Sequence, residues 1–288
     1  MKWALLSVSC LLCIGLVNGQ EEKKANWNVI ERDGRNYVSA RNMASFYQFT
    51  NVWESEDAPG LSMSLESPRM EVSVLAGDEF IRVNKVKFGL FHPVVRDEES
   101  GAILISTKDL ARVIEPVLRP SRSTPREAPD RVSISPIGEA ALLEHFDIDV
   151  LQGLLKMAGW EAVGPDEERS LELELHFVEG EPAQDGVEIT TEWVGSEARE
   201  KWERSNQAIA FATAIHAQVL RGMNAKDGGV NPRAVQEATG STPVIAMHLT
   251  VPPDFVGYRH LSRLVAKALE REALVNQGRE VPVASVEE

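Results

Sequence analysis

Histidines and carboxylates are the residues of this chain that could perform acid–base or metal chemistry, because its two cysteines, Cys10 and Cys13, lie at its very start. The sequence has no Gly-x-Ser-x-Gly turn, no Gly-x-x-x-x-Gly-Lys loop and no His-Glu-x-x-His pair. The acidic run 161–174 could supply the paired carboxylates of a glycosidase, but such runs usually mark a solvated face. Because no cysteine follows Cys13, any metal site in the rest of the chain must use imidazole and carboxylate ligands.

The isolated histidines have simpler interpretations. His92 is the only histidine before residue 120, so no ligand cluster can form in the first part of the chain, and we expect a loop residue before Pro93. His216 falls among Ile209, Ala212 and Val219 at helical spacing, which predicts that it packs in the core.

Residues 1–19 read as a secretory signal peptide. Lys2 precedes an uncharged apolar run that ends before Asn18 and Gly19, and the run is too short to span about 30 Å of hydrocarbon comfortably. Cleavage would leave a cysteine-free exported protein, periplasmic or extracellular, without disulfides or a transmembrane anchor. An uncleaved membrane anchor is the alternative.

Composition and charge divide the chain in two. The 288 residues suffice for two modest domains, and 43% hydrophobic with 26% charged residues is ordinary globular usage. The net charge of −14 argues against nucleic acid as a partner. Up to Pro120 there are 14 basic and 16 acidic residues, and afterwards 16 and 28, so the acidity belongs to the second half. Four prolines between residues 116 and 129 predict an extended linker over 120–130.

The first half, residues 27–119, contains a short internal repeat. Residues 37–44 and 104–111 each combine a short apolar strand, a serine positioned as a helix N-cap (Ser39 or Ser106) and an amphipathic turn. Strand-like segments lie between them, at 61–65, 70–75 and 80–90. This small α+β pattern resembles the copper amine oxidase N-terminal-like domain, a module attached to secreted bacterial proteins. The resemblance implies no copper chemistry.

The second half, residues 131–276, alternates strands with helices, and residues 277–288 form a tail. We expect strands at 131–136, 160–163, 170–178, 186–194 and 243–251, and helices at 139–158, 196–221 and 255–275. In 170–178 leucines and Phe177 alternate with Glu172, Glu174 and His176, which predicts one buried and one polar face. The order of elements predicts an α/β sandwich with a mostly parallel central sheet.

Several strings of this half, in the same order, resemble the zinc-dependent N-acetylmuramoyl-L-alanine amidases. They are Leu-Glu-His-Phe-Asp-Ile-Asp-Val at 143–150, Leu-His-Phe at 175–177, Asp-Gly-Val-Glu-Ile at 185–189, the segment 205–218, Gly-Gly-Val at 228–230 continuing to Thr239, and Thr-Pro-Val-Ile-Ala at 242–246. The resemblance implies an amidase-like fold that acts on the bond between muramic acid and the peptide stem of peptidoglycan. Peptidoglycan or another cell-envelope protein is therefore the expected partner.

The resemblance also implies a zinc ion held by two histidines and a glutamate, with a second glutamate as general base. Glu144 matches the glutamate ligand and His176 the second histidine. The turn that carries the first histidine in the family is Ser-Pro-Ile-Gly-Glu at 135–139 and contains none, while His248 stands at the position of the base. We therefore expect a catalytically degenerate protein that acts by binding or regulation, with no cofactor, and with zinc as the metal if one is held.

Two alternatives stay open. A site of Glu144, His176 and His248 is chemically permissible, and would keep an active zinc-dependent amidase possible in spite of the missing base. The other alternative is a structural envelope protein, in which Glu144 is a solvated helix residue and the two histidines are satisfied polar residues of their strands.

Overall fold

The computed structural model describes residues 27–56, 60–68, 70–119, 130–180, 187–194, 202–233 and 242–276. The expected signal peptide 1–19, all but the last residue of the linker 120–130 and the tail 277–288 lie outside the described residues. Within the described part, none of the helices combines the length and the apolar character needed to cross a bilayer.

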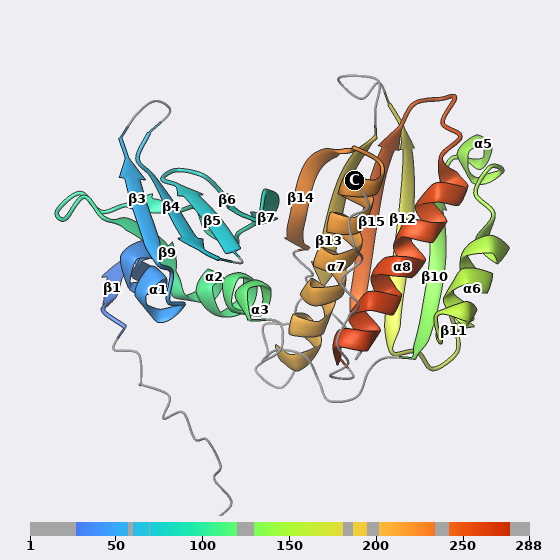
Figure 1. Cartoon of the computed structure of the whole chain (residues 1–288), viewed down its shortest axis with the longest axis horizontal. Coiled ribbons are helices and arrows are strands. Elements are labelled where there is room, and N and C mark those ends of the chain that lie inside the picture. The colour runs from blue at the N-terminus through green and yellow to red at the C-terminus, as the bar shows by residue number, and fades with distance from the viewer. Residues whose placement is uncertain are drawn as a thin grey trace, which may run out of the picture.

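The first half contains two groups of antiparallel strands together with short helices (Figure 1). Its elements are β1 (Val29–Arg32), β2 (Arg35–Ser39), α1 (Ala40–Phe46), β3 (Asn51–Ser55), β4 (Ser62–Ser67), β5 (Met70–Leu75), β6 (Phe80–Val83), β7 (Val86–Gly89), β8 (Val95–Arg96), β9 (Ile103–Ser106), α2 (Thr107–Asp109), the π-helical turn η1 (Leu110–Ile114) and α3 (Glu115–Leu118). Both expected caps are confirmed, since the side chains of Ser39 and Ser106 accept the backbone N–H of Asn42 and Asp109.

The single strand expected over 80–90 is wrong. It is a hairpin of β6 and β7 that turns at Asn84 and Lys85, both of which have positive φ, at 49° and 70°. A two-residue turn with both central residues at positive φ matches the twist of antiparallel strands, and asparagine tolerates this conformation.

The second half places helices between strands, as expected (Figure 1). Its elements are β10 (Arg131–Gly138), α5 (Ala140–Leu143), α6 (Ile148–Met157), β11 (Glu161–Val163), β12 (Leu171–Glu179), β13 (Glu188–Val194), α7 (Trp202–Gly222), β14 (Lys226–Arg233), β15 (Val244–Val251) and α8 (Tyr258–Asn276). The one helix expected over 139–158 is instead two, because Asp147 caps a new helix by accepting the N–H groups of Asp149 and Val150.

One eleven-stranded sheet runs through both halves, in the order β11-β10-β12-β15-β13-β14-β7-β6-β5-β4-β3. In the second half β10 pairs in parallel with β11 and β12, β12 with β15, and β13 with β14, whereas β13 and β15 are antiparallel. The parallel pairing of β14 with β7, at Val230 and Phe88, joins the halves. The strands β1, β2, β9 and β8 form a separate four-stranded sheet.

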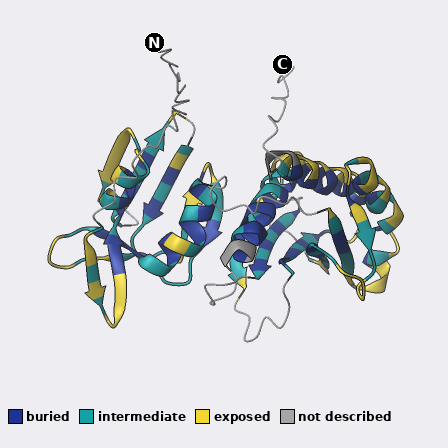
Figure 2. Ribbon diagram, turned by 90° about the horizontal axis from the view of Figure 1, so that it is seen from below, coloured by how far each residue is buried: buried dark blue, intermediate teal, exposed yellow. Residues whose placement is uncertain are grey.

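The sheet of the second half has two unlike faces. Leu171, Leu173, Leu175 and Phe177 of β12 are buried on the side where α6, α7 and α8 lie, which confirms the alternation expected from the sequence (Figures 1 and 2). Burying each such side chain stabilises the fold by about 1.5–3 kcal/mol. The intervening residues point to the opposite side, which we call the polar face.

Candidate functional site

His176 and His248 lie side by side on the polar face. They are directly paired in the parallel register of β12 and β15, so their side chains leave the same side of the sheet. Their imidazole rings stack, with centroids 4.4 Å apart and planes inclined by 27°. Two of the three site residues expected from the sequence are therefore neighbours.

Each imidazole faces a carboxylate. His176 Nε2 lies 3.0 Å from Glu174 Oε2, two residues away on the same strand, and His248 Nε2 lies 3.3 Å from Glu192 Oε2 on β13. The four side chains are 21–34% exposed, so they can be reached by solvent without being fully solvated. Each pair can hold a proton between a ring nitrogen and a carboxylate oxygen.

Arg233, in the last position of β14, completes this group. Its Nη1 lies 3.3 Å from Glu174 Oε2 and its Nε lies 3.8 Å from Glu192 Oε2. Register pairing places Ala246 directly between these two glutamates, so no larger side chain separates the carboxylates. We call Glu174, His176, Glu192, Arg233 and His248 the polar cluster.

Glu144, the expected glutamate ligand, does not join the polar cluster. It is exposed at the end of α5, and two residues later Phe146 packs 5.1 Å from Phe177, on the helix-covered side of the sheet. His176 points to the other side. Among the residues that the structure describes, no group of three or more histidines, cysteines, aspartates or glutamates could hold a metal ion.

The polar cluster can make hydrogen bonds of several kinds. Neither imidazole hydrogen-bonds to a hydroxyl within the described residues, so the arrangement lacks the nucleophile–base pair of a covalent hydrolase. Partly exposed acceptors, a guanidinium fork and flat imidazoles together suit a ligand rich in hydroxyl and amide groups.

Another histidine, His216, forms a hydrogen-bond network in the core. His216 is fully buried, as expected, with Nδ1 3.1 Å from Thr191 Oγ1 and Nε2 3.0 Å from Asp227 Oδ1. The order hydroxyl–imidazole–carboxylate is that of a catalytic triad, but Thr191 is also fully buried and open to no substrate.

This network instead fixes the joint between the halves. Asp227 also accepts the backbone N–H of Lys87 on β7 at 2.9 Å and that of Gly229 at 2.8 Å. Burial alone would raise the pKa of Asp227, but the hydrogen bonds from His216, Lys87 and Gly229, together with the charge of His216, bring that pKa below its ordinary value.

Sequence reasoning missed two members of the polar cluster. Glu192 alternates with buried Ile189, Thr191 and Trp193, so the strand pattern could have placed it on the polar face. Arg233 gave no such signal, because β14 contains Gly228, Gly229 and Pro232, which are poor strand formers.

Comparison with known proteins gives likeness in structure alone. No protein-family model matches the chain, and no curated protein matches it. Solved structures of N-acetylmuramoyl-L-alanine amidases align with it. AmiC2 of Nostoc punctiforme is 13% identical, covers 54% of this chain and 99% of its own, and has a TM-score of 0.35. The amidase from Clostridium difficile 630 is 11% identical, with coverages of 54% and 100% and a TM-score of 0.37. The CwlD amidase from Clostridioides difficile, in complex with the GerS lipoprotein, is 7% identical, with coverages of 52% and 98% and a TM-score of 0.36.

Proposed function

We propose that this is an exported protein of the cell wall that uses an N-acetylmuramoyl-L-alanine amidase scaffold to bind peptidoglycan, without hydrolysing it. The ordered strings of residues 131–276 support the scaffold, and the apolar segment 1–19 supports export. In this proposal residues 27–119 form the copper amine oxidase N-terminal-like module that accompanies the binding domain.

The observation that carries the proposal is the position of Arg233. In the proposed assignment His176 stands at a zinc-ligand position and His248 at that of the catalytic glutamate. A guanidinium within 3.3 Å and 3.8 Å of the two carboxylates that face these rings offsets part of their negative charge without a metal ion. With the first histidine ligand absent from the sequence and Glu144 on the other side of the sheet, the zinc-bound water that the family reaction needs has no three-ligand cradle.

The polar cluster in turn suits a glycan-peptide surface. Sugar hydroxyls and peptide amides can exchange hydrogen bonds with carboxylates, guanidinium and imidazole nitrogens. Binding through exposed polar groups of this kind is weak per contact and gains strength when a polymer presents many copies of its ligand.

The test combines co-sedimentation with purified peptidoglycan and an assay of muropeptide release, with and without added zinc. We expect the protein to sediment with the polymer and to release nothing. His176→Ala with His248→Ala should weaken sedimentation at least fivefold, whereas Arg263→Gln, exposed on α8, should not change it.

Two results would overturn the proposal. Zinc-dependent release that is lost in both Glu144→Ala and His176→Ala would show an active amidase. Failure to sediment, or sedimentation that ignores the histidine substitutions, would leave a structural envelope protein without recognition at the polar cluster.

A further inference from the structure

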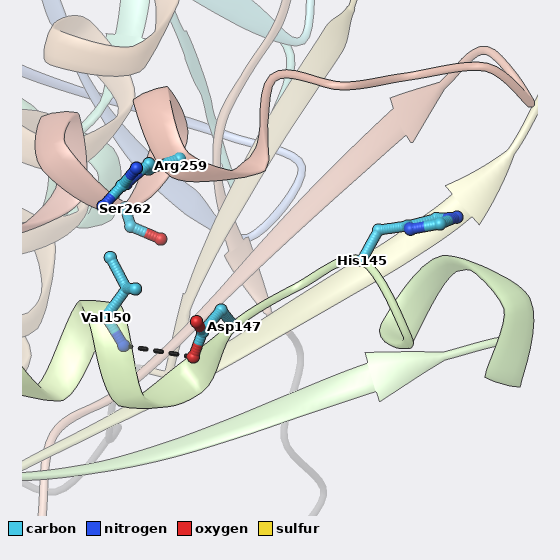
Figure 3. Close-up of a pocket in the computed structure, with 5 residues that line it drawn as sticks. All are labelled: His145, Asp147, Val150, Arg259 and Ser262. Atoms are coloured by element: carbon cyan, nitrogen blue, oxygen red, sulfur yellow. Dashed lines mark hydrogen bonds between the residues drawn. The ribbon is translucent and has the colours of Figure 1, made fainter.

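A pocket of about 260 Å³ lies between α6 and α8, on the face of the sheet opposite to the polar cluster. Figure 3 shows Asp147 and Val150 at the start of α6 facing Ser262 and Arg259 at the start of α8, with His145 on the turn before α6. Both helices begin after strands of the parallel part of the sheet, so the pocket lies near the carboxyl ends of β10 and β15, where α/β folds commonly bind ligands.

The pocket carries two opposite charges, on the exposed residues Asp147 and Arg259, that do not pair with each other. Asp147 accepts the N–H groups of Asp149 and Val150, at 3.1 and 3.3 Å, through Oδ1 alone, and no residue that the structure describes donates to its Oδ2. Arg259 makes no ion pair or hydrogen bond with any residue that the structure describes, Asp147 included. An aspartate and an arginine that line one pocket without pairing leave room for a ligand between them.

The remaining walls define what such a ligand looks like. Ser262 donates its hydroxyl hydrogen to the carbonyl of Tyr258, so its oxygen is left to accept. Val150 supplies an apolar wall. Arg259 lies in the first turn of α8, where the helix dipole adds to its attraction for an anion.

We propose that this pocket binds a zwitterionic α-amino acid. The carboxylate would pair with the Arg259 guanidinium, and the ammonium would donate to Asp147 Oδ2 and Ser262 Oγ. A small apolar side chain would lie on Val150. A volume of 260 Å³ corresponds to about nine water molecules, which is room for a ligand of roughly six to ten non-hydrogen atoms.

This site does not depend on the proposed function. The pocket residues lie on the helix-covered side, and the polar cluster on the opposite face of the sheet, so either can fail without the other. Wall binding is measured by sedimentation, and amino-acid binding by titration with a small molecule.

The test is a two-dimensional NMR titration of the full chain with L-alanine, D-alanine, N-acetyl-L-alanine and L-alaninamide. We expect saturable shifts at the amides of residues 147–150 and 258–262 with one or both alanine enantiomers. A dissociation constant in roughly the millimolar range is what a six-atom ligand can reach. N-Acetylation removes the ammonium and amidation removes the carboxylate, and each should weaken binding at least tenfold.

Two substitutions assign the charges. Arg259→Gln should weaken alanine at least tenfold but leave the residual binding of L-alaninamide unchanged, because that probe has no carboxylate to lose. Asp147→Asn keeps the helix cap and should weaken alanine at least tenfold while sparing N-acetyl-L-alanine. Arg263→Gln, one turn along α8 and outside the pocket, is the matched control and should bind alanine normally. Equal shifts with all four probes, no saturable shift with either alanine, or binding that ignores Arg259→Gln would overturn the proposal.

Discussion

The imidazole rings of His176 and His248 stack on each other with a centroid separation of 4.4 Å. The stack is a direct consequence of sheet register, since paired residues of adjacent strands are separated by the strand spacing of about 4.8 Å and share a face. Each ring is then held at its Nε2 edge by a different glutamate. The pair is therefore held by contacts on two sides while its side chains stay partly exposed.

Removing the cation from the polar cluster should raise the affinity of this face for a divalent metal ion, because it removes a like charge. Arg233→Gln leaves Glu174 and Glu192 without their shared guanidinium beside two imidazoles, a set of oxygen and nitrogen donors that zinc accepts. We expect the variant to bind zinc at least tenfold more tightly than the wild type, as measured by competition with a chromophoric chelator.

The control for this experiment is Arg169→Gln, which removes an arginine paired with Glu172 at 2.8 Å on the same strand but outside the polar cluster. It should leave zinc affinity unchanged. Tight zinc binding by the wild type, or equal affinity in the wild type and Arg233→Gln, would contradict the role given to Arg233.

The buried carboxylate of Asp227 should stabilise the joint between the halves. Asp227→Asn replaces one of the two acceptor oxygens by an NH2 group. In the aspartate, Lys87 donates to Oδ2, while Gly229 and His216 contact Oδ1, so the single oxygen of asparagine cannot serve all three. Leaving one buried donor unsatisfied costs about 1–3 kcal/mol. Urea denaturation should show this loss, whereas Asp254→Asn, at an exposed position, should show none.

The pH dependence of this loss has a definite sign. The pKa of Asp227 is lower in the folded protein than its ordinary value of 3.8, so its contribution to stability is complete above about pH 4 and is lost as the pH falls through the folded-state pKa. The difference between the wild type and Asp227→Asn should therefore shrink in acid. A difference that stays constant down to pH 2 would show that the charge of Asp227 is not what stabilises the joint.

The sequence predicted local features better than the joint between the halves. Alternation in β12 placed His176 on a polar face, and serine at 39 and 106 predicted helix starts, because these signals depend only on neighbouring residues. The pairing of β14 with β7 depends on contacts between residues about 140 positions apart. Because β14 contains two glycines and a proline, its sequence does not predict a strand. Glu144 and His176 belong to one proposed ligand set in the sequence, but their separation on two sides of the sheet is a property of the tertiary fold.

Glu272, on α8, should make the protein less stable as the pH rises. Burial raises the pKa of Glu272 to about 7, with the charge of Arg271 opposing the shift, against an ordinary value of 4.5. Since the folded state holds this proton more tightly than the unfolded chain, stability falls between about pH 4.5 and 7. Glu272→Gln should be about 1–3 kcal/mol more stable than the wild type at pH 8 and equal to it at pH 4.

Denaturation at several pH values measures this effect. Glu270→Gln, two residues earlier and exposed, is the matched control and should follow the wild type at every pH. A gain in Glu272→Gln that is the same at pH 4 and pH 8 would show that ionisation of Glu272 is not its cause.

The close approach of β7 and β14 at Gly89 offers a direct test of whether the halves are joined as one sheet. A Cβ atom at Gly89 would lie 2.4 Å from Asn231 Oδ1 and 3.3 Å from Pro232 Cδ, so Gly89→Ala must push the two strands apart or displace the asparagine. Overpacking of this kind costs about 1–3 kcal/mol. In an Asn231→Ala background the nearest contact is gone, and the cost of Gly89→Ala should fall by at least about 0.5 kcal/mol, which is the coupling expected of residues in contact.

Gly153→Ala, on α6 with no atom within 4 Å of the added Cβ, is the control and should instead stabilise the protein by about 0.5–1 kcal/mol. Urea denaturation of the wild type, the single variants Gly89→Ala and Asn231→Ala and the double variant gives the coupling directly, and additive costs would mean that the Asn231 side chain does not oppose the added Cβ atom in solution.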